Sequence, residues 1–405
     1  MRAESLALIA AALLAATPAQ RRETPDEPEV DPYTRNEPDA KAAAGYASFG
    51  PFPFADEHDT AQVEHVLGEA ARLRWVETEH FKIGSELVPY SLSGVPKAER
   101  QKIRAELERL AEKIPSVRPD VARLDPWLRL HLFAQRAEDL YGEFRGRLGV
   151  EDGDFPAGPG GDGEPYGGEG PYLGQPAKYT LLLFQKASAF GHYFRTFARR
   201  EGTMAMRHNF ASVGSLFFGT AVELDDPPYR SDTALHCRVV FSLVHNLVNG
   251  FKFYSHDVPV WWSEGLAHWS ARRIDPRFST PSEIRIYAQD PEMAWNWEPR
   301  VRARVEFEEY PRAAQLLRIV DRDRLDFVGH MMAWSRVDYL MTLGDEKFAA
   351  FMDRMKGRIV PPGRSPTTEE ILARQEAALE EAWGLDPEGF DAAWTAWVKK
   401  NYRRK

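Results

Sequence analysis

The sequence predicts an α+β protein in which a mixed α/β lobe with a small sheet precedes a mostly helical lobe, with a cleft between them. The chain has 405 residues, which is too many for one small core and favours two lobes. Before residue 231, short apolar runs typical of strands alternate with segments of helical periodicity. After residue 231 the periodicity is helical almost throughout, so we expect an α/β lobe over 60–230 and a helical lobe over 231–405.

The first 59 residues are expected to precede both lobes. Residues 1–19 have the features of a cleaved signal peptide, because Arg2 precedes a short apolar run at Leu6–Ala16 and small residues follow it. Residues 20–59 are rich in Pro, Glu and Asp and predict a linker or arm. We therefore expect an exported protein, periplasmic or extracellular. It should have no membrane span after signal removal, because the apolar run is too short to cross a bilayer.

Composition argues against two classes of protein. Acidic residues outnumber basic ones by 61 to 52, for a formal net charge of −9, which argues against a general nucleic-acid binder. The single cysteine, Cys237, excludes an internal disulfide and a cysteine-based zinc site. Cys237 lies in an apolar helical run, so we expect a small core residue rather than a nucleophile.

The α/β lobe is predicted from alternating helix and strand patterns. The expected elements include helices at 60–74 and 97–114 and strands at 75–83 and 213–224. The last of these strands is placed at the sheet edge facing the cleft. Two further stretches, 130–147 and 180–198, are similar to each other, and each predicts a buried strand running into a helix. Between them, the Gly-rich and acidic segment 149–175 predicts a surface insertion without the Lys or Ser/Thr of a phosphate loop.

The helical lobe is predicted from apolar residues at helical spacing. Its expected helices are 231–249, 263–273, 327–343, 346–356, 367–383 and 391–402. Ser231 or Asp232 is expected to cap the first of them, and Gly344 to end the third.

Two short segments of this lobe bear on chemistry. In a helix of the form HExxH, two histidines on one helix face bind one zinc ion and the glutamate polarises a zinc-bound water. The corresponding run here is HNLVN at 245–249, and WSEGLA follows at 262–267. These segments resemble the gluzincin clan of metallopeptidases, in the peptidase MA-like branch, whose third zinc ligand is a glutamate in a W-x-E-G-x-A context.

The resemblance is specific at one segment and general elsewhere. Trp262, Glu264, Gly265 and Ala267 match the family context. The order of the predicted elements between residues 75 and 402 also resembles that branch. The resemblance implies a zincin-like fold in which one helix binds zinc and the next brings the third ligand.

The departures from the family pattern decide the expected function. The resemblance implies a general-base glutamate at position 246 and a zinc-binding histidine at position 249, and both are asparagine. An amide has no useful proton affinity near neutral pH, and its oxygen is a poor zinc ligand beside imidazole. Only His245 and Glu264 remain, so we expect no catalytic residue, no cofactor and no metal, with Asn246 and Asn249 vestigial. His245 is then expected to be a buried imidazole hydrogen-bonded to Glu264 or Asn249.

Other residues offer a rearranged zinc site. His268 lies four residues after Glu264 on the same helix face, so the two side chains can chelate one ion. His256 and Asp257, in the loop between the two helices, are further candidates. His236 is expected on the side of its helix opposite the motif and is a poor candidate.

Two weaker arrangements remain as alternatives. One is a Ser–His–Glu triad formed by Ser242 or Ser263 with His245 and Glu264, although no G-x-S-x-G pattern supports it. The acids of Glu223–Asp226 offer a carboxylate pair for glycoside chemistry, but solvated loop acids are the commoner explanation.

Three functions follow from these observations. The first, which we favour, is an exported gluzincin-like pseudopeptidase that binds a peptide or protein partner. The second is an active zinc-dependent hydrolase or peptidase whose rearranged site uses His245, Glu264 and His268. The third is a cell-envelope structural or carbohydrate-binding protein, in which Trp295 and Trp297 line the cleft while other tryptophans fill the core.

Overall fold

The computed structural model describes residues 29–68, 71–158, 166–224, 231–254, 258–278, 295–357, 364 and 366–404. Contacts group Asp31–Lys405 into one compact unit, which combines a small sheet with a helical C-terminal region as predicted. The expected signal peptide lies outside the described residues. None of the helices in the described part of the chain is long and apolar enough to cross a membrane.

The α/β part is built on a five-stranded sheet. Its strands, in spatial order, are β3 (Arg74–Glu77), β4 (Phe81–Ser85), β7 (Tyr179–Phe184), β9 (Ser215–Ala221) and β8 (Met206–Phe210). The three central strands run parallel, and the two edge strands pair antiparallel with their neighbours. Every residue of β7 and β9 is buried, which is typical of strands covered on both faces. Short strands also pair outside this sheet, β1 (Pro53–Phe54) with β2 (His58–Asp59) and β5 (Tyr90–Ser91) with β6 (Arg123–Leu124).

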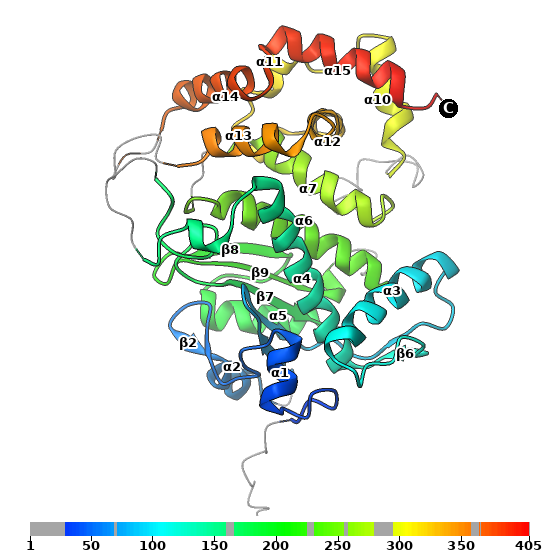
Figure 1. The fold of residues 1–405 in the computed structure, drawn as a ribbon, viewed down its shortest axis with the longest axis vertical. Helices are drawn as coiled ribbons and strands as arrows, with labels where there is room; N and C mark the ends of the chain where they lie inside the picture. The colour runs from blue at the N-terminus through cyan, green and yellow to red at the C-terminus, as the bar shows by residue number, and fades with distance from the viewer. Residues whose placement is uncertain are drawn as a thin grey trace, which may run out of the picture. The chain divides into compact units, whose positions relative to one another are not determined.

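Helices cover both faces of the sheet. On one face, α2 (Thr60–Leu67) and α5 (Ala187–Tyr193) pack against Leu182 and Phe184. The other face, with Leu181 and Leu183, packs against helices of the larger core (Figure 1). These helices are α4 (Pro126–Leu148) and α6 (Asp232–Gly250), and α3 (Lys97–Lys113) packs against α4. The alternation of strand side chains therefore divides the hydrophobic residues between two cores.

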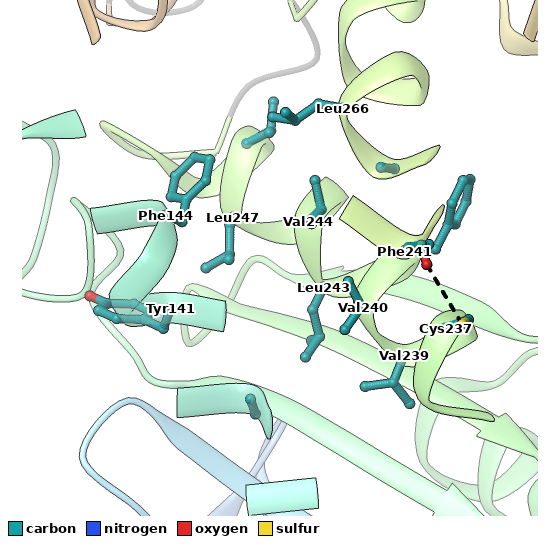
Figure 2. Close-up of a cluster of buried hydrophobic side chains, with 14 of the residues drawn as sticks. Tyr141, Phe144, Cys237, Val239, Val240, Phe241, Leu243, Val244, Leu247 and Leu266 are labelled. Atoms are coloured by element: carbon teal, nitrogen blue, oxygen red, sulfur yellow. Dashed lines mark hydrogen bonds between the residues drawn. The ribbon is translucent and has the colours of Figure 1, made fainter. Parts of the chain in front are cut away.

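Helix α6 is enclosed by three other elements. Ser231 caps it by accepting a hydrogen bond from the Ala234 backbone N–H at 2.9 Å, as predicted. Its apolar residues lie between the sheet, α4 and the next helix, α7 (Val260–Ile274). Figure 2 shows the side chains of Tyr141 and Phe144 from α4 and of Leu266 from α7 gathered around it. The HNLVN run is thus held in a buried environment.

The helical region stacks on α7, on the side away from the sheet (Figure 1). Its helices are α10 (Trp297–Glu306), α11 (Ala313–Leu316), α12 (Phe327–Met341), α13 (Asp345–Met355), α14 (Thr368–Trp383) and α15 (Pro387–Asn401). The four helices predicted between 327 and 402 are confirmed, with ends shifted by a few residues. Local signals explain their starts: Thr367, for example, forms a capping box with Glu370 at the start of α14.

The strand predicted within 130–147 is wrong, because this stretch lies inside the single helix α4. Asp125 caps α4 by accepting hydrogen bonds from the backbone N–H groups of Trp127 and Leu128 at 2.9 and 3.1 Å. Residues 127–137 are all buried, since α4 is covered on every side. A continuous apolar run has no periodicity that separates such a helix from a buried strand. Of the two similar stretches, only 180–198 contains a strand followed by a helix.

Two strand predictions are corrected in their details. The stretch 75–83 falls in two antiparallel strands, β3 and β4, rather than one. The strand predicted within 213–224 is β9, which lies inside the sheet between β7 and β8. The edge next to it is β8, whose residues are mostly half-buried. Strand order depends on non-local pairing, which the local pattern does not carry.

The segment before α2 is attached to the sheet. Residues Pro38–Ala44 form α1, and Asp31 is fully buried, with its carboxylate 3.1 Å from His131 Nε2. Ser48 pairs with Glu77 of β3, and the Glu77 backbone N–H donates to the Ser48 carbonyl at 2.7 Å. The outer edge of β3 is therefore partly covered.

A buried charge cluster joins three helices at the start of α6. Asp232 accepts hydrogen bonds from Arg129 Nη2 at 3.2 Å and from Arg136 Nη1 at 2.6 Å. Arg136 also donates to Glu106 of α3 at 2.7 Å. Burial acts to raise the pKa of Asp232, but the two guanidinium groups outweigh it and hold that pKa below its usual value. The cluster therefore stays charged and fixes α6 against α3 and α4.

We predict that Asp232→Ala destabilises the protein by about 3–5 kcal/mol, because it leaves two buried guanidinium groups without their shared carboxylate. The free energy of unfolding, measured in urea, checks this. Glu108→Ala is the matched control, since Glu108 pairs with Arg104 at the surface and its loss costs less than about 1 kcal/mol. Equal costs for the two variants would contradict the role given to the cluster.

Candidate functional site

The candidate site forms where α7 and α12 approach each other closely. A Cβ atom at Gly265 would lie 2.6 Å from Val337 Cγ2 and 2.7 Å from the Ala333 carbonyl oxygen, so no larger residue fits without displacement. Glu264 and His268 flank this contact on α7, and His330 lies one turn before Ala333 on α12. The close approach therefore brings His330 to the glutamate of the WSEGLA segment.

Glu264 is the centre of the site. Its side chain is 2% exposed, and its two carboxylate oxygens face different partners. Oε1 is 2.8 Å from Arg322 Nε and 3.4 Å from His245 Nε2. Oε2 is 3.5 Å from His330 Nδ1 and accepts no hydrogen bond from the described residues. The buried negative charge is thus balanced from one side by a guanidinium group.

Two histidines complete a compact group with Glu264. His268 Nε2 lies 3.1 Å from His330 Nδ1, and the rings are nearly perpendicular. Ligand-type atoms of Glu264, His268 and His330 all lie within 4.8 Å of one another, and all three residues are buried. The prediction placed His268 beside Glu264 but did not include His330.

His245 lies beside this group. Its ring is buried against Phe241, and its Nε2 is 3.4 Å from Glu264 Oε1, yet it makes no hydrogen bond with the described residues. Burial, with the positive charges of Arg207 and Arg322, lowers its pKa well below the usual value, so the imidazole is neutral. The expected proximity to Glu264 is present, but the expected hydrogen bond is not formed.

The two asparagines of the motif do not join a ligand group. Asn246 is 3% exposed, and its amide nitrogen has no hydrogen-bond partner in the described part of the chain. Asn249 is half-buried near the end of α6, where its backbone carbonyl accepts from Lys356 Nζ at 2.7 Å. The residues that the family resemblance assigns to zinc, at positions 245, 249 and 264, do not fit the ion, because the amide at 249 replaces an imidazole.

The remaining polar candidates are engaged elsewhere or lie outside the described residues. His236 lies 3.8 Å from Glu106 on the α3 side of α6, away from the motif as predicted. Ser263 donates to the carbonyl of Val260 within α7, and Glu223 accepts from the Ala187 backbone N–H at the start of α5. Outside the described residues are His256, Asp257, Asp225 and Asp226. Ser242 is buried on α6.

Tryptophans near the site belong to the core. Trp261 and Trp262 are fully buried, and Trp269 is half-buried. Trp297, expected in a loop, instead begins α10 and is fully buried. Arg272 stacks on its ring, with the guanidinium carbon 4.2 Å from the ring centroid. Trp297 has no exposed face on which a sugar could stack.

Arg207 and Arg322 make the surroundings of Glu264 positive. Arg207 lies on the edge strand β8, where burial lowers its pKa to about 10 despite the opposing influence of Glu264. Arg322, in the short 3₁₀ helix Arg322–Arg324 before α12, has a side chain 44% exposed and reaches inward to Glu264. Neither arginine belongs to a recognisable motif, so the sequence analysis did not include them.

A second group of ligand-type residues lies beside the start of β4. Both ring nitrogens of His80 are engaged, Nδ1 with Glu138 at 2.6 Å and Nε2 with Asp152 at 3.0 Å. Burial opposes protonation, but the two carboxylates outweigh it and raise the pKa of His80. A pocket of about 490 Å³ lies beside it, with Tyr46, Tyr172 and Lys178 in its lining. Because the imidazole is already bonded at both nitrogens, we assign no ion to this group.

Comparisons with known proteins identify no family for this chain, so the site is interpreted from its own residues. No family model matches the sequence. No curated protein matches it either.

We predict that Gly265→Ala destabilises the protein by about 1–3 kcal/mol, because the added methyl group overlaps Ala333 and Val337. Thermal or urea unfolding checks this. Gly142→Ala on α4 is the matched control, since a Cβ there meets nothing within 4 Å and should stabilise the helix by about 0.5–1 kcal/mol. A neutral effect at Gly265 would contradict the close approach of α7 and α12.

Proposed function

We propose that this chain is an exported, zincin-like pseudopeptidase that binds a peptide or protein partner and does not hydrolyse it. The helix pair α6 and α7 supports the zincin-like interpretation, because HNLVN lies on the first helix and the WSEGLA glutamate on the second. His245 and Glu264 lie together as that interpretation requires. The asparagines at 246 and 249 remove the base and one ligand from the same arrangement.

The observation that carries the proposal is the ion pair between Glu264 and Arg322. A glutamate that binds catalytic zinc at the family position is neutralised mainly by the ion. Here Arg322 lies 2.8 Å from Glu264 Oε1 and supplies a positive charge in its place. The carboxylate is therefore stable in a buried position without the motif's zinc ion.

The edge strand β8 supports binding of an extended peptide. The opposite edge, β3, is partly covered by its bridge to Ser48, whereas the outer edge of β8 has no partner strand in the described part of the chain. An uncovered edge can add a peptide strand through backbone hydrogen bonds. Arg207 on this strand, with Arg322 nearby, favours peptides that carry a carboxylate.

An active zinc-dependent hydrolase is the second candidate, and the proximity of Glu264, His268 and His330 favours it. Such an enzyme needs a general base in addition to its ligands. The position next to His245 holds the amide of Asn246, and Glu264 is the single carboxylate of the group. The geometry therefore supports binding better than hydrolysis.

We predict that the wild-type protein cleaves no member of a peptide library with zinc present. Asn246→Glu combined with Asn249→His should add zinc affinity that depends on His245, which the wild type lacks, because it restores the missing ligand beside Glu264. Mass spectrometry of the library and zinc titration with and without His245→Ala check these outcomes. Asn246→Glu alone is the control, since it adds a base but no ligand. Chelator-sensitive cleavage by the wild type would contradict the proposal.

We also predict that extended acidic peptides bind beside β8. Arg207→Glu should weaken their binding by about tenfold, because it reverses a charge at the proposed contact. Fluorescence anisotropy with labelled acidic and basic peptides measures this, and Arg104→Glu, on the exposed side of α3, is the control. Equal binding of both peptide classes, or no effect of Arg207→Glu, would count against this surface.

A further inference from the structure

We propose that Glu264, His268 and His330 form a binding site for one divalent transition-metal ion, with zinc as the reference ion. This site differs in position from the zinc site that an HExxH motif would form with Glu264. This site goes beyond the proposed pseudopeptidase function and does not depend on it. It uses a ligand from α12 that the motif lacks, and it uses neither His245 nor Asn249.

The donor set fits such an ion. Two imidazole nitrogens and one carboxylate are the protein ligands of many catalytic zinc sites and of other first-row metal sites. Ligands about 2.0–2.1 Å from a common ion lie about 3–3.5 Å from one another. His268 Nε2 and His330 Nδ1 are 3.1 Å apart, and His330 Nδ1 and Glu264 Oε2 are 3.5 Å apart.

Hydrogen bonds among Glu264, His268 and His330 alone satisfy their facing lone pairs poorly. A single proton on His330 Nδ1 would be shared between His268 Nε2 and Glu264 Oε2. If the proton is on His268 Nε2 instead, a lone pair of His330 faces the carboxylate oxygen with no hydrogen between them. One cation accepts all three lone pairs at once.

Arg322 is compatible with the ion because it uses the other carboxylate oxygen. It holds Glu264 Oε1 at 2.8 Å, which leaves Oε2 directed at the two histidines. Metal-binding carboxylates are commonly hydrogen-bonded in this way by residues outside the ligand set. The Arg322 side chain is 44% exposed, so solvent screens its charge.

The ion would connect two helices. Glu264 and His268 come from α7 and His330 from α12, on either side of the tight contact at Gly265. Binding would thus strengthen the junction between the α/β part and the helical region. No further carboxylate belongs to this group among the described residues.

The test measures zinc binding to the full chain after treatment with a chelator. Wild-type protein should take up one zinc ion per chain, and its Tm should rise with zinc. His330→Ala and His330→Gln should each weaken zinc binding by more than about 100-fold, since even changes outside the ligand set cost about 10–100-fold. His236→Ala is the matched control, because it removes a half-buried histidine of α6 that lies away from the site.

X-ray absorption of zinc-loaded wild-type protein keeps the test decisive if the variants fold poorly. It should show at least two imidazole ligands at about 2.0–2.1 Å. The proposal is overturned if wild-type protein binds no zinc, if both His330 variants bind it normally, or if fewer than two imidazoles are found. Failure here leaves the pseudopeptidase proposal standing, because that proposal is decided by peptide cleavage and not by zinc uptake.

Discussion

The close packing of α7 against α12 at Gly265 is the constraint on which the site depends. Only a residue without a side chain lets the Ala333 carbonyl approach α7 so closely. The same approach places His330 beside Glu264 and His268. Because α7 also packs on α6, the HNLVN run, the WSEGLA segment and α12 form one continuous buried block.

Two buried carboxylates illustrate how this protein balances charge. Both oxygens of Asp232 accept hydrogen bonds from arginines, so the group is fully satisfied. Glu264 differs, because Arg322 engages one oxygen and the other faces two histidines without a hydrogen bond from the described residues. A buried acceptor left in this way is costly, which is the physical basis for placing a cation there.

On the proposed zincin-like interpretation, the asparagine at position 249 and the Arg322 guanidinium group near Glu264 are consistent with each other. On that interpretation, the asparagine at position 249 provides no imidazole for an ion that would neutralise Glu264. An unpaired buried carboxylate would destabilise α7, and a guanidinium group from the segment before α12 relieves this.

Local patterns in the sequence were sufficient for most helices and for their starts. The cap at Ser231 depends on contacts within a few residues, so the sequence alone predicted it, and the capping box at Thr367 is equally local. The apolar run in α4 was misinterpreted because a helix buried on all sides has no exposed face to reveal its period. The order of β8 and β9 depends on pairing between strands, which local sequence does not encode.

The sequence by itself determined the α6–α7 helix pair, the amide side chains at Asn246 and Asn249 within it, and the proximity of His268 to Glu264. Only the tertiary structure decided which groups surround Glu264. Arg322 and His330 are distant from it in the chain and lie in no motif, and they reach it because α12 packs against α7. Contacts between helices depend on the shape of their packed surfaces, so they become visible only when the chain is folded.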